Sequence, residues 1–171
     1  MATMWSSEGE QEIVTKLDAL VATVNTEIGL LDSIVRLLHE KMLRYNWVGF
    51  YMIEERPGEE TMLVLGPYRG SMTPHTRIRL NQGICGAAAS TGKTVVVDDV
   101  ASDPRYLACS METKSEIVVP LFVCGEVVGE LDIDSHFAAA FGTDDKRLCE
   151  YAAMVAGSAL GRIRMTVVSR S

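Results

Sequence analysis

The chain lacks the features that place a protein in or across a membrane. No window of membrane-spanning length is free of charged residues, and the first residues, MATMWSSEGEQE, lack the basic region and long apolar run of a secretory signal. It also has no CxxC pair and only three histidines, which gives little support for a structural zinc site. We therefore expect a cytoplasmic protein with no membrane partner, no metal and no other cofactor.

Positive charge is in short supply. The chain has 16 Lys and Arg against 23 Asp and Glu, a formal net charge of −7. This balance argues against nucleic acid and against an anionic membrane surface, because both would repel the protein. A cationic or zwitterionic small ligand remains compatible with it. The length of 171 residues, 47% of them hydrophobic, suits one globular domain with a full core.

Hydrophobic spacing and turn residues predict the order of helices and strands. Helices are expected at 13–24, after a Ser-Ser start, and at about 30–45, with a short helix at 84–90. A last helix is expected from a cap at Thr143, with Arg162 and Arg164 in its final turn. Strands are expected at 46–53, 62–66, 77–80, 94–99, 115–123 and 126–134.

Helices at both ends and some six strands joined mainly by hairpins indicate an α+β domain with an antiparallel sheet. We expect this domain to span residues 10–165, with tails at 1–9 and 166–171. A polar loop of about a dozen residues, from Val100 to Lys114, interrupts the pattern. Loops of this length without secondary structure are often functional.

The stretch GELDIDS carries three acidic residues on one face of a strand. Side chains alternate along a strand, so Glu130, Asp132 and Asp134 lie on the same face, about 7 Å apart. A hairpin turn at Cys124-Gly125 would bring Glu116 opposite Asp132 to Asp134. The face is either a solvated edge or a cluster that holds a cation or shares a proton.

Two cysteines are candidates for redox chemistry. Cys109 lies in the long loop, where core packing does not explain a thiol. Cys85 lies at the start of the short helix, where backbone N–H groups favour a thiolate, although a small buried residue would also suit the position. Cys124 is interpreted as incidental to the hairpin turn and Cys149 as structural. None of the histidines stands in a catalytic frame.

The runs NWVGFY, LVLGPYRG, GICG, YLACSMETKSEIVVPL and GELDIDS resemble the GAF-domain free methionine-(R)-sulfoxide reductases in order and spacing, from about residue 12 to residue 160. The resemblance implies a single GAF-type domain with a six-stranded antiparallel sheet, flanked by helices, that encloses a pocket for one free amino acid. It implies that Cys109 is the nucleophile. It further implies that the substrate pocket is lined by Glu116, Asp132, Asp134, Trp47 and Tyr51.

In this interpretation, the carboxylates bind the ammonium group of free methionine-(R)-sulfoxide, and one of them supplies a proton to the sulfoxide oxygen. Cys109 becomes a sulfenic acid, which a second thiol converts to a disulfide, and thioredoxin or a similar dithiol reduces that disulfide. Glu130 falls outside the family pattern and is expected to be a solvated or flanking acid. A homodimer is plausible for this family.

One position departs from the family pattern. Many members carry a further cysteine ten residues before that of GICG, and here the position is His75. Cys85 is then the best remaining candidate for the resolving thiol; if it does not reach Cys109, either an external thiol reduces the sulfenic acid directly or the activity is weak or lost. The alternatives are a GAF domain that senses an amino-acid-like ligand without turnover, and a structural dimerisation domain that uses the N-terminal helices.

Overall fold

Helices at both ends of the chain enclose a run of strands in the computed structural model, which describes residues 5–108 and 110–169. The elements follow one another as α1 (Glu8–Thr23), α2 (Glu27–Lys41), β1 (Trp47–Glu54), β2 (Met62–Arg69), β3 (Arg77–Arg79), α3 (Gly83–Thr91), β4 (Val95–Val97), the 3₁₀ turn η1 (Val100–Ser102), β5 (Ser115–Val123), β6 (Glu126–Ser135) and α4 (Thr143–Val168). Every predicted helix and strand is present. The polar loop from Val100 to Lys114, which was expected to have no secondary structure, begins with the turn η1.

The strands form one six-stranded sheet in the order β3-β2-β1-β6-β5-β4, and all neighbouring strands are antiparallel. The predicted α+β fold with an antiparallel sheet is therefore confirmed. Strand β6 lies between β1 and β5, so it is a central strand. This excludes the solvated edge as an interpretation of its acidic face.

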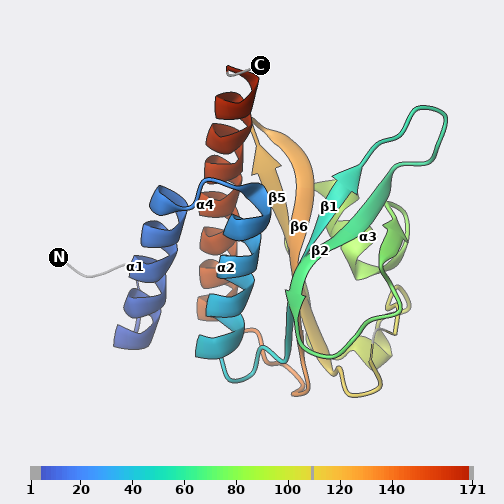
Figure 1. The fold of residues 1–171 in the computed structure, drawn as a ribbon. Helices are drawn as coiled ribbons and strands as arrows, with labels where there is room; N and C mark the ends of the chain where they lie inside the picture. The colour runs from blue at the N-terminus through green and yellow to red at the C-terminus, as the bar shows by residue number, and fades with distance from the viewer. Residues whose placement is uncertain (1–4, 109, 170–171) are drawn as a thin grey trace.

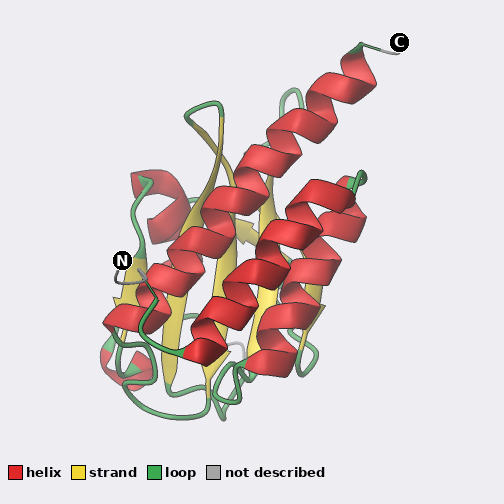
Figure 2. Cartoon of the chain, turned by 90° about the vertical axis from the view of Figure 1, so that its left-hand side faces the viewer, coloured by secondary structure: helices red, strands yellow, loops and turns green. Residues whose placement is uncertain are grey.

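The sheet separates two layers. Helices α1, α2 and α4 lie along one face, and α3 lies on the other (Figure 1). Seen from the helical side, α4 crosses in front of the strands and extends beyond them toward the C-terminus (Figure 2). Two hydrophobic cores follow from this arrangement: a large one between the three long helices and the sheet, and a smaller one beneath α3. None of the described helices is long and apolar enough to cross a membrane.

The hairpin between β5 and β6 sets the register of the acidic strands. Its turn residues, Cys124 and Gly125, both have positive φ, at 51° and 83°. Two such residues form the tight turn whose twist matches that of antiparallel strands. A register shift between Leu121 and Phe122 then moves the pairing by one residue, so Glu116 lies opposite Asp134, within the range 132–134 that the turn predicts.

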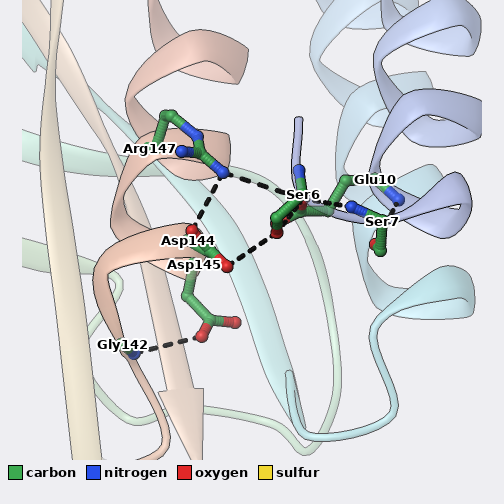
Figure 3. Close-up of polar contacts among 7 residues, drawn as sticks. All are labelled: Ser6, Ser7, Glu10, Gly142, Asp144, Asp145 and Arg147. Atoms are coloured by element: carbon green, nitrogen blue, oxygen red, sulfur yellow. Dashed lines mark hydrogen bonds and ion pairs between the residues drawn. The ribbon is translucent and has the colours of Figure 1, made fainter. Parts of the chain in front are cut away.

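A polar network joins the start of α1 to the start of α4 (Figure 3). Ser7 and Glu10 form a capping box, in which the Glu10 N–H donates to Ser7 Oγ at 3.1 Å and the Ser7 N–H donates to Glu10 Oε2 at 3.2 Å. The Ser6 hydroxyl donates to Asp144 at 2.7 Å, and Arg147 pairs with Asp144 at 2.9 Å. The network ties the predicted Ser-Ser start to a helix far away in the sequence.

Two details predicted for the last helix are wrong. Gly142, and not Thr143, is the cap of α4, and its N–H donates to Asp145 Oδ2 at 3.0 Å. The helix also continues to Val168, so Arg162 and Arg164 do not lie in its final turn. Arg164 instead pairs with Glu27 at the start of α2, at 2.9 Å. Helix α4 thus includes residues 166–168, which were expected to belong to the C-terminal tail. The domain limits of 10–165 stay a prediction.

Candidate active site

Four carboxyl groups gather on the sheet face that α3 covers. Three come from β6 and one from β5, and we call this set the carboxylate cluster: Glu116, Glu130, Asp132 and Asp134. Residues directly opposite in neighbouring strands share a face, and Glu116 lies opposite Asp134. The structure therefore brings together the acidic residues that the sequence predicts to meet.

The cluster is buried. The exposed fractions are 5% for Glu116, 0% for Glu130, 3% for Asp132 and 4% for Asp134. The expectation that Glu130 is a solvated acid is therefore wrong, because β6 is central and α3 packs against β5 and β6. Within the described chain, neither oxygen of Glu130 has a hydrogen-bond partner, and the same is true of Asp132 Oδ1.

Burial shifts the pKa of every carboxyl group in the cluster upward. Desolvation is the largest cause, and it raises the pKa of Asp132 from 3.8 to about 7. The pKa values of Glu116, Glu130 and Asp134 are raised well above their ordinary range by burial and then by the charge of Asp132. Protonated carboxylic acids near neutral pH are the expected result, and such groups can donate protons.

Cys85 lies against this cluster. Its thiol donates to Asp132 Oδ2 at an Sγ–Oδ2 distance of 3.5 Å. Burial, followed by the charges of Asp132, Glu130 and Glu116, raises the pKa of the Cys85 thiol well above 9.0. Of the two interpretations of this position, the structure therefore favours the small buried residue over a thiol activated by the start of a helix.

Aromatic side chains form a wall beside the cluster. The Trp47 ring lies between those of Tyr51 and Tyr68, with centroid distances of 6.2 and 5.5 Å. In the strand pairing Trp47 lies opposite Asp134 and Tyr51 opposite Glu130. Both predicted aromatic residues thus share a face with the carboxylates, as expected.

Gly49 and Tyr68 are parts of this wall that sequence reasoning missed. A Cβ atom on Gly49 would come within 2.4 Å of Trp47 Cη2, so only glycine leaves room for the indole to lie back over β1. Gly49 is also paired with Asp132 across the sheet. Both residues stand in the motifs NWVGFY and LVLGPYRG, but their role depends on the stacking of side chains from different strands.

The aromatic wall also holds the loop between β2 and β3 at two points. Trp47 Nε1 donates to the carbonyl oxygen of Ser71 at 3.1 Å, and the Tyr51 hydroxyl donates to the carbonyl oxygen of His75 at 2.7 Å. The His75 ring lies with Nε2 at 3.2 Å from the carbonyl oxygen of Ala108. The position at which many family members carry a cysteine is therefore in contact with the loop that contains Cys109. Cys109 itself lies outside the described residues.

A small pocket opens at the outer end of the cluster. It has a volume of about 20 Å³ and is lined by Asn46, Trp47, Ser71, Met72, Thr73, Ser110, Thr113, Asp134 and His136. This volume is enough for about one water molecule. A much larger hollow of about 690 Å³ lies elsewhere, between α4 and the edge of the sheet, and contains no member of the cluster. We take the small pocket as the candidate site, because polar side chains converge there beside the buried Asp134.

The other two described cysteines lie away from the cluster. Cys124 is exposed in the hairpin turn, and Cys149 is buried in the large core, where its sulfur is 3.6 Å from the Tyr45 hydroxyl. Burial raises the pKa of Cys149 to about 12. These positions agree with the interpretation of Cys124 as incidental and of Cys149 as structural.

Comparison with known proteins identifies the fold family. The GAF domain family matches residues 27–160. The chain is 34% identical over 130 residues to a free methionine-R-sulfoxide reductase of Escherichia coli strain K12, covering 76% of this chain and 75% of the relative. It is 42% identical over 106 residues to a free methionine-R-sulfoxide reductase of Saccharomyces cerevisiae, covering 61% of this chain and 57% of the relative.

A solved structure agrees with these relatives. The crystal structure of free methionine-R-sulfoxide reductase from Neisseria meningitidis, in complex with its substrate, is 32% identical, with a TM-score of 0.85. The match covers 96% of this chain and 98% of the other. The region that the GAF domain family matches, residues 27–160, contains the carboxylate cluster, the aromatic wall and the loop of Cys109. The chain belongs to the GAF-domain family of free methionine-R-sulfoxide reductases.

Proposed function

We propose that this protein reduces free L-methionine-(R)-sulfoxide to methionine. The observation that carries the proposal is the carboxylate cluster, buried on the same sheet face as Trp47 and Tyr51. Buried carboxyl groups are unfavourable unless they are protonated or meet a cation. The ammonium group of a free amino acid is such a cation, whereas the uncharged amide nitrogen of a peptide-bound residue is not.

The reaction begins with Cys109. Its thiolate attacks the sulfoxide sulfur and forms an Sγ–S bond, while a protonated carboxylic acid of the cluster donates its proton to the oxygen, which leaves the substrate sulfur as hydroxide. The hydroxide then bonds to Sγ as the Sγ–S bond breaks, so methionine leaves and Cys109 becomes a sulfenic acid. The substrate sulfur gains two electrons and the cysteine loses two. Asp132, with a pKa of about 7, is matched to proton donation near neutral pH. Ser110, the chain neighbour of Cys109, lines the small pocket, which supports this placement of the nucleophile.

Substrate entry requires the pocket to widen. A volume of about 20 Å³ is far too small for methionine sulfoxide. The lining residues Ser71, Met72 and Thr73 belong to the loop between β2 and β3, which Trp47 and Tyr51 hold by hydrogen bonds. We therefore infer that this loop shifts when substrate binds, with the aromatic wall as its fixed support.

Regeneration of Cys109 needs a second thiol. Among the described residues, Cys85 is the cysteine that shares the cluster's face of the sheet, so it remains our candidate for the resolving thiol. Its raised pKa means that it reacts only after a neighbouring carboxylate accepts its proton. Attack on the sulfenic acid then forms a disulfide and releases water, and thioredoxin or a similar dithiol reduces the disulfide. Such reductants suit a cytoplasmic enzyme, and we propose that the enzyme is a homodimer.

A coupled assay tests the function. NADPH consumption with thioredoxin and thioredoxin reductase is compared for the free R sulfoxide, its S epimer and an N-blocked R sulfoxide. We expect turnover of the free R form alone, and none with Cys109→Ser. Equal turnover of the N-blocked compound would contradict the role given to the ammonium group. No turnover with any sulfoxide, even with dithiothreitol as reductant, would favour a GAF domain that only senses its ligand.

A further inference from the structure

Cys85 and two of the carboxyl groups, Glu116 and Asp132, form a compact set within the cluster. One ligand atom from each of Cys85, Glu116 and Asp132 can be chosen so that all three lie within 4.8 Å of one another, and all three residues are buried. Glu130 adds a third buried acid from the same strand as Asp132. We propose that Cys85, Glu116, Asp132 and Glu130 bind one thiophilic divalent cation of the Zn²⁺ type.

The distances suit such an ion. Zn²⁺ binds sulfur at about 2.3 Å and carboxylate oxygen at about 2.0–2.2 Å, so neighbouring ligands of a tetrahedral site lie about 3.5 Å apart. The Cys85 sulfur and Asp132 Oδ2 already stand 3.5 Å apart. The Glu116 oxygen, within 4.8 Å of both, needs a side-chain movement of about 1 Å.

An independent observation points to a missing partner. Both oxygens of Glu130 and Oδ1 of Asp132 are fully buried and have no hydrogen-bond partner in the described chain. Glu130 lies close enough to the Cys85 thiol and to Asp132 for both to affect its pKa. Buried polar atoms of this kind are expected to be satisfied, and a cation would occupy their lone pairs. The proposed reduction assigns no separate step to Glu130, and a bound cation would account for the burial of its two unpartnered oxygens.

The donor set selects the metal. One thiolate and several carboxylates suit Zn²⁺, or Cd²⁺ as its probe, whereas Mg²⁺ and Ca²⁺ prefer oxygen ligands alone. Binding releases the proton of Cys85 and any protons held by the acids. The four ligands come from α3, β5 and β6, so no CxxC spacing marks the site in the sequence. Glu116 and Asp132 also belong to the proposed ammonium site, so metal and substrate would compete; this consequence alone rests on the proposed function.

The test measures metal binding in the absence of sulfoxide. The full-length, reduced and metal-free protein is titrated with Zn²⁺ against a chromophoric chelator. We expect one ion per chain and a weakening of at least about tenfold in Cys85→Ser and in Glu130→Gln. Cys124→Ser and Glu126→Gln, which change an exposed thiol and an exposed acid at the other end of β6, should bind as the wild type does. Far-UV circular dichroism of each variant checks that it is folded.

Cd²⁺ identifies the thiol. A thiolate bound to Cd²⁺ gives an ultraviolet charge-transfer band, which should appear in wild type and in Cys109→Ser and be absent in Cys85→Ser. Failure to bind Zn²⁺, or binding unaffected by both Cys85→Ser and Glu130→Gln, would overturn the proposal. So would a band that depends on Cys109 and not on Cys85. Because no readout uses turnover, these failures would leave the proposed reductase activity intact.

Discussion

At the scale of single residues, Asp132 is where burial, charge and thiol chemistry meet. It stands between two other acids of the same strand and accepts a hydrogen bond from Cys85. Burial raises its pKa to about 7, and the hydrogen bonds from Cys85 and from the backbone of Ile133 lower it by less. An ordinary aspartic acid would be fully ionised at neutral pH. The raised value keeps a transferable proton on Asp132 under these conditions.

We expect Asp132→Asn to lower kcat/KM for free methionine-(R)-sulfoxide by about 100-fold or more, since asparagine keeps the shape but cannot donate an acidic proton. In the wild type, kcat should fall as the pH rises through about 7, because the acid must be protonated to act. Steady-state kinetics against pH measure both effects. Glu126→Gln, an exposed acid on the same strand, is the control. Unchanged kinetics in Asp132→Asn would mean that another group donates the proton.

At the scale of elements, the aromatic wall on β1 depends on one small residue, Gly49, which leaves room for the Trp47 ring. A Cβ atom on Gly49 would also lie 2.7 Å from Trp47 Cζ3 and 2.9 Å from Tyr68 Cβ. A strand glycine usually weakens a sheet, so its presence marks a close approach of side chains. The wall in turn holds the loop between β2 and β3, at Ser71 and at His75.

Gly49→Ala should therefore displace the indole and loosen the loop between β2 and β3. We expect KM to rise or kcat/KM to fall by about 10- to 100-fold, because small displacements of positioning groups have effects of this size. Near-UV circular dichroism should change as the stack of Trp47 is disturbed. Gly9→Ala, on α1, is the control, because its Cβ would meet only Ser7 Oγ at 3.9 Å. Wild-type kinetics together with a wild-type spectrum would show that the strand can accommodate a side chain here.

The capping box of α1 offers a prediction for stability alone. Ser7→Ala removes the acceptor of the Glu10 N–H, and it should reduce the free energy of unfolding by about 1 kcal/mol. Kinetics should not change, because α1 lies on the opposite side of the sheet from the carboxylate cluster (Figure 1). Urea denaturation measures the loss, and Thr15→Ala, which changes an exposed mid-helix side chain, is the comparison. An equal loss in both variants would argue against a special role for the cap.

At the scale of the whole molecule, four buried acids make stability depend on pH. Their pKa values are higher in the folded state than in the unfolded chain, so the folded protein binds more protons. Stability therefore falls as the pH rises above the unfolded values near 4 toward the folded ones. For Asp132 alone, the difference between 3.8 and about 7 corresponds to roughly 4 kcal/mol.

We expect the urea midpoint to be lower at pH 8 than at pH 5.5, measured with a chelator present so that no cation offsets the charge. Glu130→Met, which replaces a fully buried acid with an apolar side chain of similar size, should raise the midpoint at pH 8 more than at pH 5.5. Glu126→Met, at an exposed position, should change neither. A midpoint that increases from pH 5.5 to pH 8 would contradict the upward pKa shifts.

Much of the molecule could be predicted from the sequence because the evidence is local. Helical spacing and strand alternation identify every helix and strand, and the alternation in GELDIDS places its three acids on one face. The Cys124-Gly125 turn predicts that Glu116 lies opposite Asp132 to Asp134, and a register shift between Leu121 and Phe122, which the sequence does not indicate, makes Asp134 the partner. Local evidence is weaker at the ends of helices and strands. Thr143 is a residue type that often caps a helix, but the cap of α4 is Gly142, because the Asp145 side chain accepts a hydrogen bond from its N–H.

Tertiary structure decided the environment of those acids and of Cys85. Burial depends on which elements lie on either side, and only the order β1-β6-β5 under α3 makes Glu130 inaccessible. The same packing raises the pKa of Cys85, although its position at a helix start predicts the opposite. Sequence alone thus determined which groups share a face, since side-chain direction follows from the backbone repeat. Their protonation and their closeness to the thiol depend on desolvation, which arises only when distant segments pack together.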